Sequence, residues 1–382
     1  HQLTDSGASL LVTIPMFLDV ATAGAEGTGV TDIFVLGDAT DAAASVTDLF
    51  GEPLAAAVEV DSIRDVVALP YSSGTTGLSK GVMLSHHNLI ANVAQVLGAS
   101  GLDESDVVIA VLPFFHIYGM QVLMNAGLRA GATIVTMPRF DLEQFLQLHQ
   151  QHGVTRSFVA PPIVVALAKH PIVDQYDLSD VKQVFSGAAP LSAELAHEAA
   201  DRLGCEVVQG YGMTELSPVS HLTVEGGFKP GSVGVTAPNT ETRIVDPLTG
   251  DELGIDEDGE VWVRGPQVML GYLNNDKATA ETLDDDGWLH TGDIGHVDAD
   301  GHLFVVDRLK ELIKFKGFQV PPAELEALLL THPAVADAAV IGLPDEESGE
   351  IPVGYVVLRP GAEVDPADIQ AFIAGQVAHY KQ

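Results

Sequence analysis

The sequence predicts an α/β fold with a large N-terminal domain, which contains a small β subdomain, and a smaller α+β C-terminal domain. Strand and helix signals alternate between residues 107 and 209. After about residue 220, short stretches alternate apolar and polar residues, and beyond residue 307 one helical stripe and two strand-like runs follow. The first pattern is typical of mostly parallel sheets flanked by helices, and the second of antiparallel strands. We therefore expect two domains, 1–307 and 308–382.

The α/β part contains short β-branched runs, which predict strands, and runs with helical spacing of apolar residues. The expected strands are 107–112, 132–137, 155–159, 181–185 and 205–209, and the expected helices include 163–168 and 192–203. A further helix has well-marked ends. Asp141 is its candidate N-cap, Gln144 completes a capping box, Phe140 and Phe145 can form a hydrophobic staple, and Gly153 ends it.

The last third of the chain predicts short strands and one helix. The expected strands are 243–245, 260–264 and 302–306 in the β subdomain, and 335–341 and 353–358 near the end of the chain. Pro321 and Pro322 can open a helix whose leucines form an apolar stripe. We interpret the acidic segments 256–259 and 298–301 as turns rather than calcium loops, and His149 and His152 as a helix end rather than a metal site.

Composition narrows the class of protein. The 382 residues are 46% hydrophobic and 19% charged, which predicts a folded chain with more than one core, and no apolar run reaches the ~20 residues of a membrane span. The one cysteine, Cys205, excludes a disulfide framework, and we interpret it as a small core residue. A net charge of -35 predicts a surface that repels nucleic acid, so a nucleotide site needs concentrated positive charge. Four of the 18 basic residues fall within 308–316.

A Gly/Ser/Thr-rich segment, 71–81, follows the apolar run 65–69. Its glycines allow backbone N–H groups to approach phosphate oxygens, its four hydroxyls can donate to them, and Lys80 adds a positive charge. A flexible surface loop is the alternative, which the four hydroxyls and the lysine make weaker. A Walker A loop needs Gly directly before the Lys and Ser or Thr after it, so this spacing argues against a P-loop NTPase.

Further motifs follow in a fixed order, at 210–215, 265–273, 287–293 and 306–320. Together with the 71–81 loop, they resemble the adenylate-forming superfamily of acyl-CoA synthetases, peptide-synthetase adenylation domains and beetle luciferases. The motif at 306–320 is especially similar to 4-coumarate/cinnamate–CoA ligases. The resemblance covers the whole chain, and it implies a large adenylating domain with a smaller mobile C-terminal domain. It also implies an enzyme that uses ATP, Mg²⁺ and CoA to convert a carboxylic acid to an acyl-adenylate and then to an acyl-CoA thioester.

The resemblance assigns roles to individual residues. ATP binding falls to Ser72, Ser73, Gly74, Thr75, Thr76, Lys80, Tyr211, Thr214, Asp293, Arg308 and Lys314. Within this set, the resemblance implies that the Tyr211 ring stacks near the adenine and that Asp293 and Arg308 bond the ribose hydroxyls. Catalytic roles fall to Lys80, Thr214, Glu215, His116 and Lys310, with Glu215 holding Mg²⁺, His116 gating the acyl site and Lys310 acting as the hinge of the small domain. CoA contacts are expected at Arg139, Lys316, Gly317 and Gln319.

The acyl-pocket positions are Tyr118, Val122, Ala188, Gln209, Gly210 and Leu222. At the position of Val122, plant coumarate enzymes can carry a hydroxyl that meets the phenol of the substrate, and valine cannot make that hydrogen bond. A site without the partner discriminates less in favour of phenolic acids. Cinnamate or another apolar acid is therefore as plausible a substrate as 4-coumarate.

Several alternatives stay open. A medium- or long-chain fatty acyl-CoA or acyl-AMP ligase, a carrier-protein-loading domain and a luciferase-like oxygenase belong to the same superfamily, and a non-catalytic nucleotide-binding fragment belongs to another class. The chain opens on a segment that resembles an internal part of these ligases and stops before the motif that supplies their adenylation lysine, so we expect this polypeptide to adenylate poorly. We expect a cytoplasmic protein, monomeric or homodimeric, that binds neither nucleic acid nor membrane.

Overall fold

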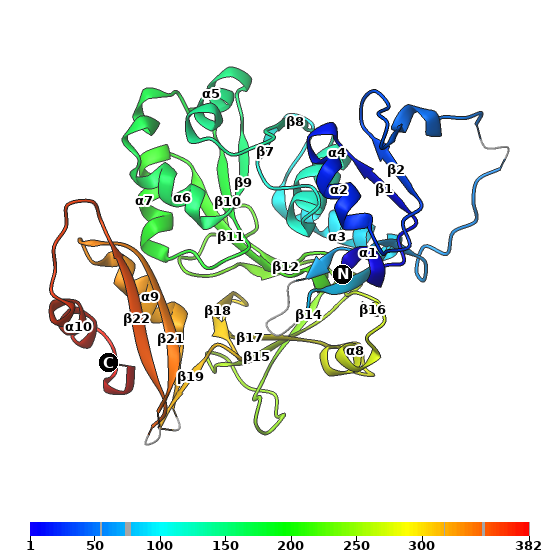
Figure 1. Cartoon of the computed structure of the whole chain (residues 1–382). Coiled ribbons are helices and arrows are strands. Elements are labelled where there is room, and N and C mark those ends of the chain that lie inside the picture. Colours follow the sequence, from blue (N-terminus) through cyan, green and yellow to red (C-terminus); the bar gives the residue numbers. More distant parts are fainter. Residues whose placement is uncertain (54–55, 73–77, 317, 346–347, 382) are drawn as a thin grey trace. The chain divides into compact units, whose positions relative to one another are not determined.

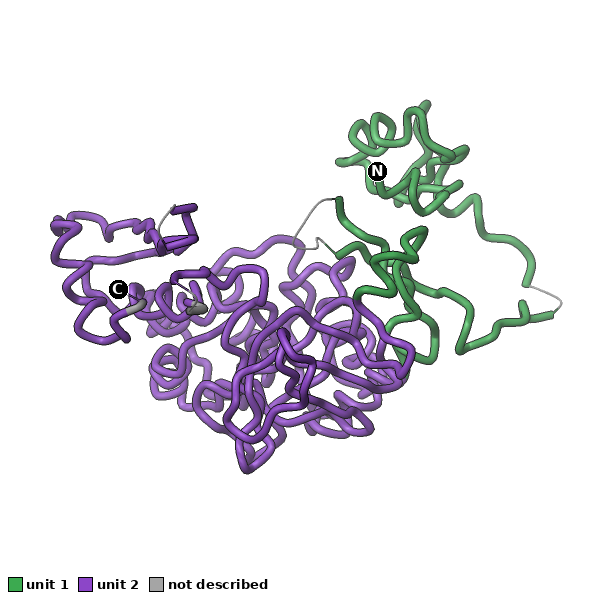
Figure 2. Tube along the Cα trace, turned by 90° about the horizontal axis from the view of Figure 1, so that it is seen from below, with its two compact units in different colours: residues 1–90, 269–281 green, residues 91–268, 282–382 purple. Residues whose placement is uncertain are grey.

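The structure, a computed structural model, describes residues 1–53, 56–72, 78–316, 318–345 and 348–381. It divides into two compact units, unit 1 with residues 1–90 and 269–281, and unit 2 with residues 91–268 and 282–382 (Figure 2). The domain boundary expected at residue 307 lies inside unit 2 and stays a prediction. In the described ranges, no helix is both long and apolar enough to cross a membrane.

Unit 1 holds two small sheets. One is parallel, with β1 (Leu10–Thr13), β2 (Asp32–Val35) and β3 (Ala44–Ser45). In the other, β6 (Lys80–Ser85) pairs antiparallel with β4 (Val66–Ala68), β5 (Tyr71–Ser72) and β16 (Gly271–Tyr272). The helical elements are α1 (Gln2–Asp5), η1 (Pro15–Phe17), α2 (Leu18–Ala25), η2 (Val46–Leu49) and α8 (Asp276–Thr282). The two described ends of the 71–81 segment therefore lie in paired antiparallel strands, β5 and β6.

Unit 2 is built on a mostly parallel sheet, which confirms the α/β prediction. Among the described residues the sheet has seven strands in the order β13-β12-β11-β10-β9-β7-β8. The strands are β7 (Val107–Ala110), β8 (Thr133–Thr136), β9 (Arg156–Val159), β10 (Gln183–Ser186), β11 (Glu206–Gly212), β12 (Val219–Leu222) and β13 (Val235–Thr236). Strands β7 to β11 are parallel to one another, β12 pairs antiparallel with β11, and β13 pairs antiparallel with β12. Strand β11 is longer than expected because its end, from Gly210 to Gly212, pairs with β12.

Helices cover both faces of this sheet (Figure 1). They are α3 (His86–Ser100), α4 (Ala126–Ala130), α5 (Leu142–His152), α6 (Pro161–Lys169) and α7 (Ala193–Leu203), with a π-helix, η3 (Gly119–Asn125), and short turns η4 (Pro171–Gln175) and η5 (Thr214–Leu216). Successive strand residues point to opposite faces. Val184 and Val207 therefore join a core with α5, α6 and α7, whereas their neighbours Phe185 and Val208 join a second core with α3, η3 and α4.

Helix α5 shows how local sequence determines where a helix begins and ends. The Asp141 carboxylate accepts a hydrogen bond from the Gln144 N–H at 2.8 Å, and Gly153 ends the helix at φ 58°. The rings of Phe140 and Phe145 lie 5.7 Å apart. These contacts confirm the predicted N-cap, staple and stop. His149 is buried in the last turn, where burial lowers its pKa to about 4, and its ring bonds Ser157 at 2.7 Å.

The predicted β subdomain is an antiparallel sheet in the order β14-β15-β17-β18. Its strands are β14 (Glu241–Val245), β15 (Gly259–Arg264), β17 (Leu289–Val297) and β18 (Leu303–Arg308). A lysine offsets part of the negative charge of the acidic turn at residues 298–301, since Lys229 forms ion pairs with Asp298 and Asp300. Within the ranges that the structure covers, no cluster of three His, Cys, Asp or Glu side chains suits a metal.

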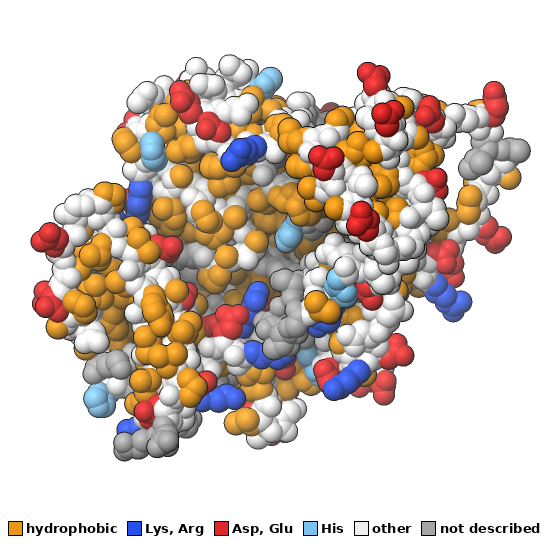
Figure 3. Space-filling model, viewed as in Figure 1, with side chains coloured by type: hydrophobic (Ala, Val, Ile, Leu, Met, Phe, Trp, Pro, Cys, Tyr) orange, Lys and Arg blue, Asp and Glu red, His pale blue; other side chains and the backbone are white. Residues whose placement is uncertain are grey.

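The C-terminal part of unit 2 is the expected α+β element. Its strands β19 (Ile313–Phe315), β20 (Phe318–Val320), β21 (Val335–Asp345) and β22 (Gly349–Leu358) form a sheet in the order β20-β19-β22-β21. Helices α9 (Pro322–Thr331) and α10 (Pro366–Ala374) pack apolar residues against it, and η6 (His379–Lys381) follows. Hydrophobic side chains also gather on the outer face of β21 and β22, where Leu343 and Tyr355 are exposed (Figure 3).

Candidate active site

The predicted phosphate loop begins and ends in paired strands. Ser72 is the last residue of β5 and pairs with Lys80, the first residue of β6. The Lys80 Nζ lies 4.1 Å from the centroid of the Tyr272 ring, which is buried at 3% exposure. A cation over an aromatic face is attracted by the ring quadrupole, so Tyr272 holds the lysine at the base of the loop. The other predicted loop residues, Ser73, Gly74, Thr75 and Thr76, lie outside the described residues.

Three predicted acyl-pocket residues come together in the second core of unit 2. Tyr118, Val122 and Leu222 are 7%, 2% and 2% exposed and belong to one apolar cluster. The Tyr118 hydroxyl donates to the Phe185 carbonyl oxygen at 3.3 Å, and burial raises the pKa of this phenol. The phenol therefore stays neutral, and the cluster presents an uncharged wall to any acyl chain that reaches it.

Phe185 is a member of this wall that the sequence motifs did not indicate. A Cβ atom built on Gly210 would lie 2.5 Å from the Phe185 ring, and one built on Gly187 would lie 3.0 Å from the Tyr118 ring. The two glycines therefore leave the space that two aromatic rings occupy. The alternation of strand residues next to Val184 is the signal that could have identified Phe185.

Two more residues predicted for the acyl site, Ala188 and Gln209, lie just after β10 and within β11, and His116 lies two residues before Tyr118. Ala188 is exposed and has a left-handed backbone, with φ 73°. The Gln209 Oε1 accepts from the Leu191 N–H at 3.1 Å and so holds the chain that follows Ala188. His116 Nδ1 accepts from the Tyr118 N–H at 3.2 Å, and desolvation lowers the pKa of this exposed imidazole. His116 is therefore a neutral ring at the edge of the wall.

Two predicted nucleotide residues, Tyr211 and Asp293, touch directly. The Tyr211 hydroxyl donates to Asp293 Oδ2 at 2.5 Å. The Asp293 Oδ1 lies 3.6 Å from Arg308 Nε, and Asp293 and Arg308 are cross-strand partners in β17 and β18. Burial raises the pKa of Asp293, against the lowering effects of the Tyr211 hydrogen bond and the Arg308 charge. Strands of two sheets, β11 in one and β17 and β18 in the other, thus bring together donor and acceptor groups that suit the hydroxyls of a sugar.

Thr214 and Glu215 form the short turn η5 directly after β11. Glu215 is 4% exposed. Mg²⁺ commonly takes one or two protein carboxylates together with phosphate oxygens of the substrate, so a single carboxylate fits this ion. The role of Glu215, four residues after Tyr211 in the chain, as a Mg²⁺ ligand stays a prediction.

The predicted hinge and CoA residues are basic and exposed. Lys310, Lys314, Lys316 and Arg139 all present their side chains at the surface of unit 2. Gln319 lies in β20, and Gly317 lies outside the described residues. Beside the hinge, Asp307 accepts hydrogen bonds from the backbone N–H groups of Arg308 at 2.7 Å and of Ala323 at 3.0 Å. This buried carboxylate ties β18 to the start of α9.

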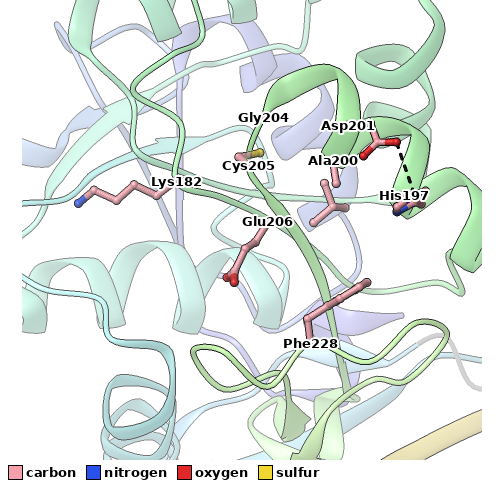
Figure 4. A pocket seen from close by; sticks show the side chains of 9 residues that line it. Lys182, His197, Ala200, Asp201, Gly204, Cys205, Glu206 and Phe228 are labelled. Atoms are coloured by element: carbon pink, nitrogen blue, oxygen red, sulfur yellow. Dashed lines mark ion pairs between the residues drawn. The ribbon is translucent and has the colours of Figure 1, made fainter.

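A surface pocket of about 480 Å³ lies elsewhere in unit 2, at the amino-terminal ends of β10 and β11. Lys182, His197, Cys205 and Phe228 line it, and among its described lining residues there is no predicted site residue (Figure 4). Burial raises the pKa of the Cys205 thiol to about 11, which leaves little thiolate near neutral pH. The thiol is therefore a poor nucleophile, in keeping with the structural role predicted for Cys205.

Comparison with known proteins gives the family. The family model "AMP-binding enzyme" matches residues 1–273, and the model "AMP-binding enzyme C-terminal domain" matches residues 324–382. The chain is 48% identical to 4-coumarate–CoA ligase 5 of Oryza sativa subsp. japonica, over 100% of this chain and 72% of that protein. It is 50% identical to 4-coumarate–CoA ligase 2 of Nicotiana tabacum, over 83% of this chain and 60% of that protein.

Among solved structures, ATP-bound MatB from Rhodopseudomonas palustris has the same fold, with a TM-score of 0.89 and 33% identity over 99% of this chain and 74% of that one. The chain thus spans about three fifths to three quarters of the length of these relatives. The fold, the ordered motifs and the two family models agree with one another. This chain therefore belongs to the AMP-binding enzyme family of adenylate-forming enzymes.

Proposed function

We propose that this protein is an ATP-dependent ligase that joins an apolar carboxylic acid, of the cinnamate or 4-coumarate type, to CoA. The observation that carries the proposal is the buried apolar wall of Tyr118, Val122 and Leu222, because Leu222 belongs to β12, which pairs with the β11 end that bears Tyr211. The names of the rice and tobacco relatives, both 4-coumarate–CoA ligases, support the choice of acid and of CoA.

The reaction has two steps that need no nucleophile from the enzyme. A carboxylate oxygen of the acid attacks the α-phosphorus of ATP, and pyrophosphate leaves. The thiol sulfur of CoA then attacks the acyl carbonyl carbon, and AMP leaves as the thioester forms. Such steps are accelerated by alignment of the reactants and by positive charge near the phosphates.

Each part of the candidate site has a proposed task in these steps. In unit 1, Lys80 and the loop from Ser72 to Thr76 hold phosphate oxygens. In unit 2, Thr214 meets the α-phosphate, Asp293 and Arg308 hold the ribose, and Lys314 faces the adenylate. Mg²⁺ held by Glu215 would offset negative charge on the phosphates.

The small domain has its own proposed tasks. We assign 1–307 to adenylation and 308–382 to a mobile domain that turns at Lys310 between the two steps. Arg139, Lys316, Gly317 and Gln319 contact CoA, and His116 gates the acyl pocket. The use of ATP and CoA suits a cytoplasmic enzyme.

Mass spectrometry of acyl-CoA products from a panel of acids tests the proposal. We expect cinnamate to be used at least as well as 4-coumarate, because Val122 offers no hydrogen bond to a phenol. Val122→Ser restores a hydroxyl and should raise the 4-coumarate-to-cinnamate ratio of kcat/KM about fivefold, the value of one ordinary hydrogen bond.

Val122→Ala is the matched control, since it removes similar volume without adding a hydroxyl, and its ratio should stay near that of the wild type. Failure to form any acyl-CoA from the panel would contradict the proposed activity. A wild-type preference for 4-coumarate of tenfold or more would contradict the account of the pocket.

A further inference from the structure

The Tyr211 hydroxyl bonds to Asp293, and the predicted contact of the Tyr211 ring with adenine does not account for this hydrogen bond. The donor and acceptor lie 82 residues apart in the chain and belong to different sheets, yet their oxygens are 2.5 Å apart. Hydrogen bonds to a charged carboxylate at this distance are among the stronger ones in proteins. The contact therefore fixes the direction of the carboxylate.

Both ends of this contact are held by regular backbone structure. Tyr211 pairs with His221 across β11 and β12, and their rings lie 5.9 Å apart. Asp293 pairs with Arg308, and its N–H donates to the Thr291 hydroxyl at 3.0 Å. The backbone at both residues is therefore fixed by a strand ladder.

The backbone directly before Asp293 is held by a second carboxylate, that of Glu260. The Gly292 N–H donates to Glu260 Oε1 at 2.9 Å, and the Trp262 Nε1–H donates to Glu260 Oε2 at 2.9 Å. Gly292 has φ 73°, a left-handed conformation that glycine adopts without strain. The backbone that carries Asp293 is therefore constrained on both sides.

The two oxygens of Asp293 have different surroundings. Tyr211 holds Oδ2, whereas Oδ1 faces Arg308 Nε at 3.6 Å, which is longer than a hydrogen bond. The Asp293 side chain is 15% exposed and that of Arg308 is 57% exposed. The Oδ1 side thus keeps capacity for a ligand hydroxyl, and the Oδ2 side is already occupied.

We infer that the Tyr211 hydroxyl is a positioning group for nucleotide recognition, which holds Oδ2 of Asp293 so that Oδ1 and the Arg308 guanidinium meet the ribose hydroxyls. This inference rests on the proposed function, because it requires that the nucleotide ribose binds at Asp293. The inference adds a role in ribose recognition for the Tyr211 hydroxyl, whereas the sequence predicted a role only for the Tyr211 ring.

The test compares binding of ATP, 2′-deoxy-ATP and 3′-deoxy-ATP by titration calorimetry with Mg²⁺ and the full chain. The wild type should prefer ATP over at least one deoxy analogue. Tyr211→Phe keeps the ring but removes the hydroxyl, so it should weaken ATP binding about tenfold and lose most of that preference. Asp293→Asn should lose the same preference, and the double variant should show no further loss.

The matched control is Tyr176→Phe, because the Tyr176 hydroxyl also donates to a carboxylate, Glu143, at 3.3 Å on the exposed surface. It should bind all three nucleotides as the wild type does. If Tyr211→Phe keeps the wild-type preference, or weakens all three nucleotides equally, the positioning role is wrong while the proposed function stands. If the wild type binds no ATP, the proposed function itself fails, and the inference fails with it.

Discussion

Replacing Gly210 by alanine tests the packing of Phe185 in the acyl-site core. A Cβ atom at Gly210 would lie 2.5 Å and 2.8 Å from two carbons of the Phe185 ring and 3.1 Å from the His221 carbonyl oxygen. Ordinary van der Waals contact begins at 3.4 Å, so the ring must retreat by about 0.9 Å, the difference between 3.4 Å and 2.5 Å.

The ring has little room for this movement. Phe185 is 7% exposed, and it packs at 5.6 Å, centroid to centroid, against Phe158, which is 1% exposed. Inserting one carbon into a well-packed core typically costs about 1–3 kcal/mol. We expect the free energy of unfolding of unit 2 to fall by that amount in Gly210→Ala.

Urea denaturation followed by tryptophan fluorescence is a suitable assay, because Trp262 and Trp288 both lie in unit 2. Gly98→Ala is the control, since Gly98 lies inside α3 and a Cβ there meets nothing within 4 Å. This control should match the wild type or gain up to about 1 kcal/mol from the better helix propensity of alanine. A Gly210→Ala protein with the wild-type urea midpoint would refute the reasoning.

Further predictions concern the buried Asp106 and a helix cap. Asp106, 1% exposed, pairs with Arg156 at 2.9 Å and Lys182 at 3.1 Å, so Asp106→Ala should cost about 3–5 kcal/mol in urea denaturation by leaving these cations without their partner. Burial raises the pKa of Asp106, but hydrogen bonds from Thr155 and Lys182 outweigh burial and hold that pKa below its usual value. The stability from this carboxylate is therefore complete above the ordinary carboxyl pKa of about 3.9 and is lost as the pH falls through the folded-state pKa. Urea midpoints between about pH 2 and pH 5 should show this loss in the wild type, mostly below the ordinary carboxyl pKa, and less of it in Asp106→Ala. Ser192→Ala removes the N-cap of α7 and should lower stability by about 1 kcal/mol in the same assay, whereas an unchanged midpoint would count against the cap.

The parts of the fold that depend on nearby residues could be predicted from the sequence. The N-cap at Asp141, the stop at Gly153 and the strand alternation around Val184 each depend on neighbours a few residues away. The strand expected to end at Gln209 continues to Gly212 because β12 pairs with it, and that pairing depends on a distant segment.

The site was predicted as a list of residues, and sequence did not give the contacts among them. The bond from Tyr211 to Asp293 depends on how two sheets are placed, and no local pattern carries that information. Phe185 was not predicted as a site residue because it lies outside the motifs. Its ring fits beside Gly210 only because glycine has no Cβ atom. Packing of this kind arises only when segments far apart in the chain meet.

The division of the parallel sheet into two cores has a consequence for how this enzyme can change. Along a strand, neighbouring side chains such as those of Val184 and Phe185 pack in different cores. Substitutions at alternate strand positions therefore alter the core that holds the predicted acyl-pocket residues, and substitutions at the positions between them alter the core under α5, α6 and α7. Variation on the face with the predicted acyl-pocket residues can thus change the preference for acids, while the packing of the opposite face stays the same.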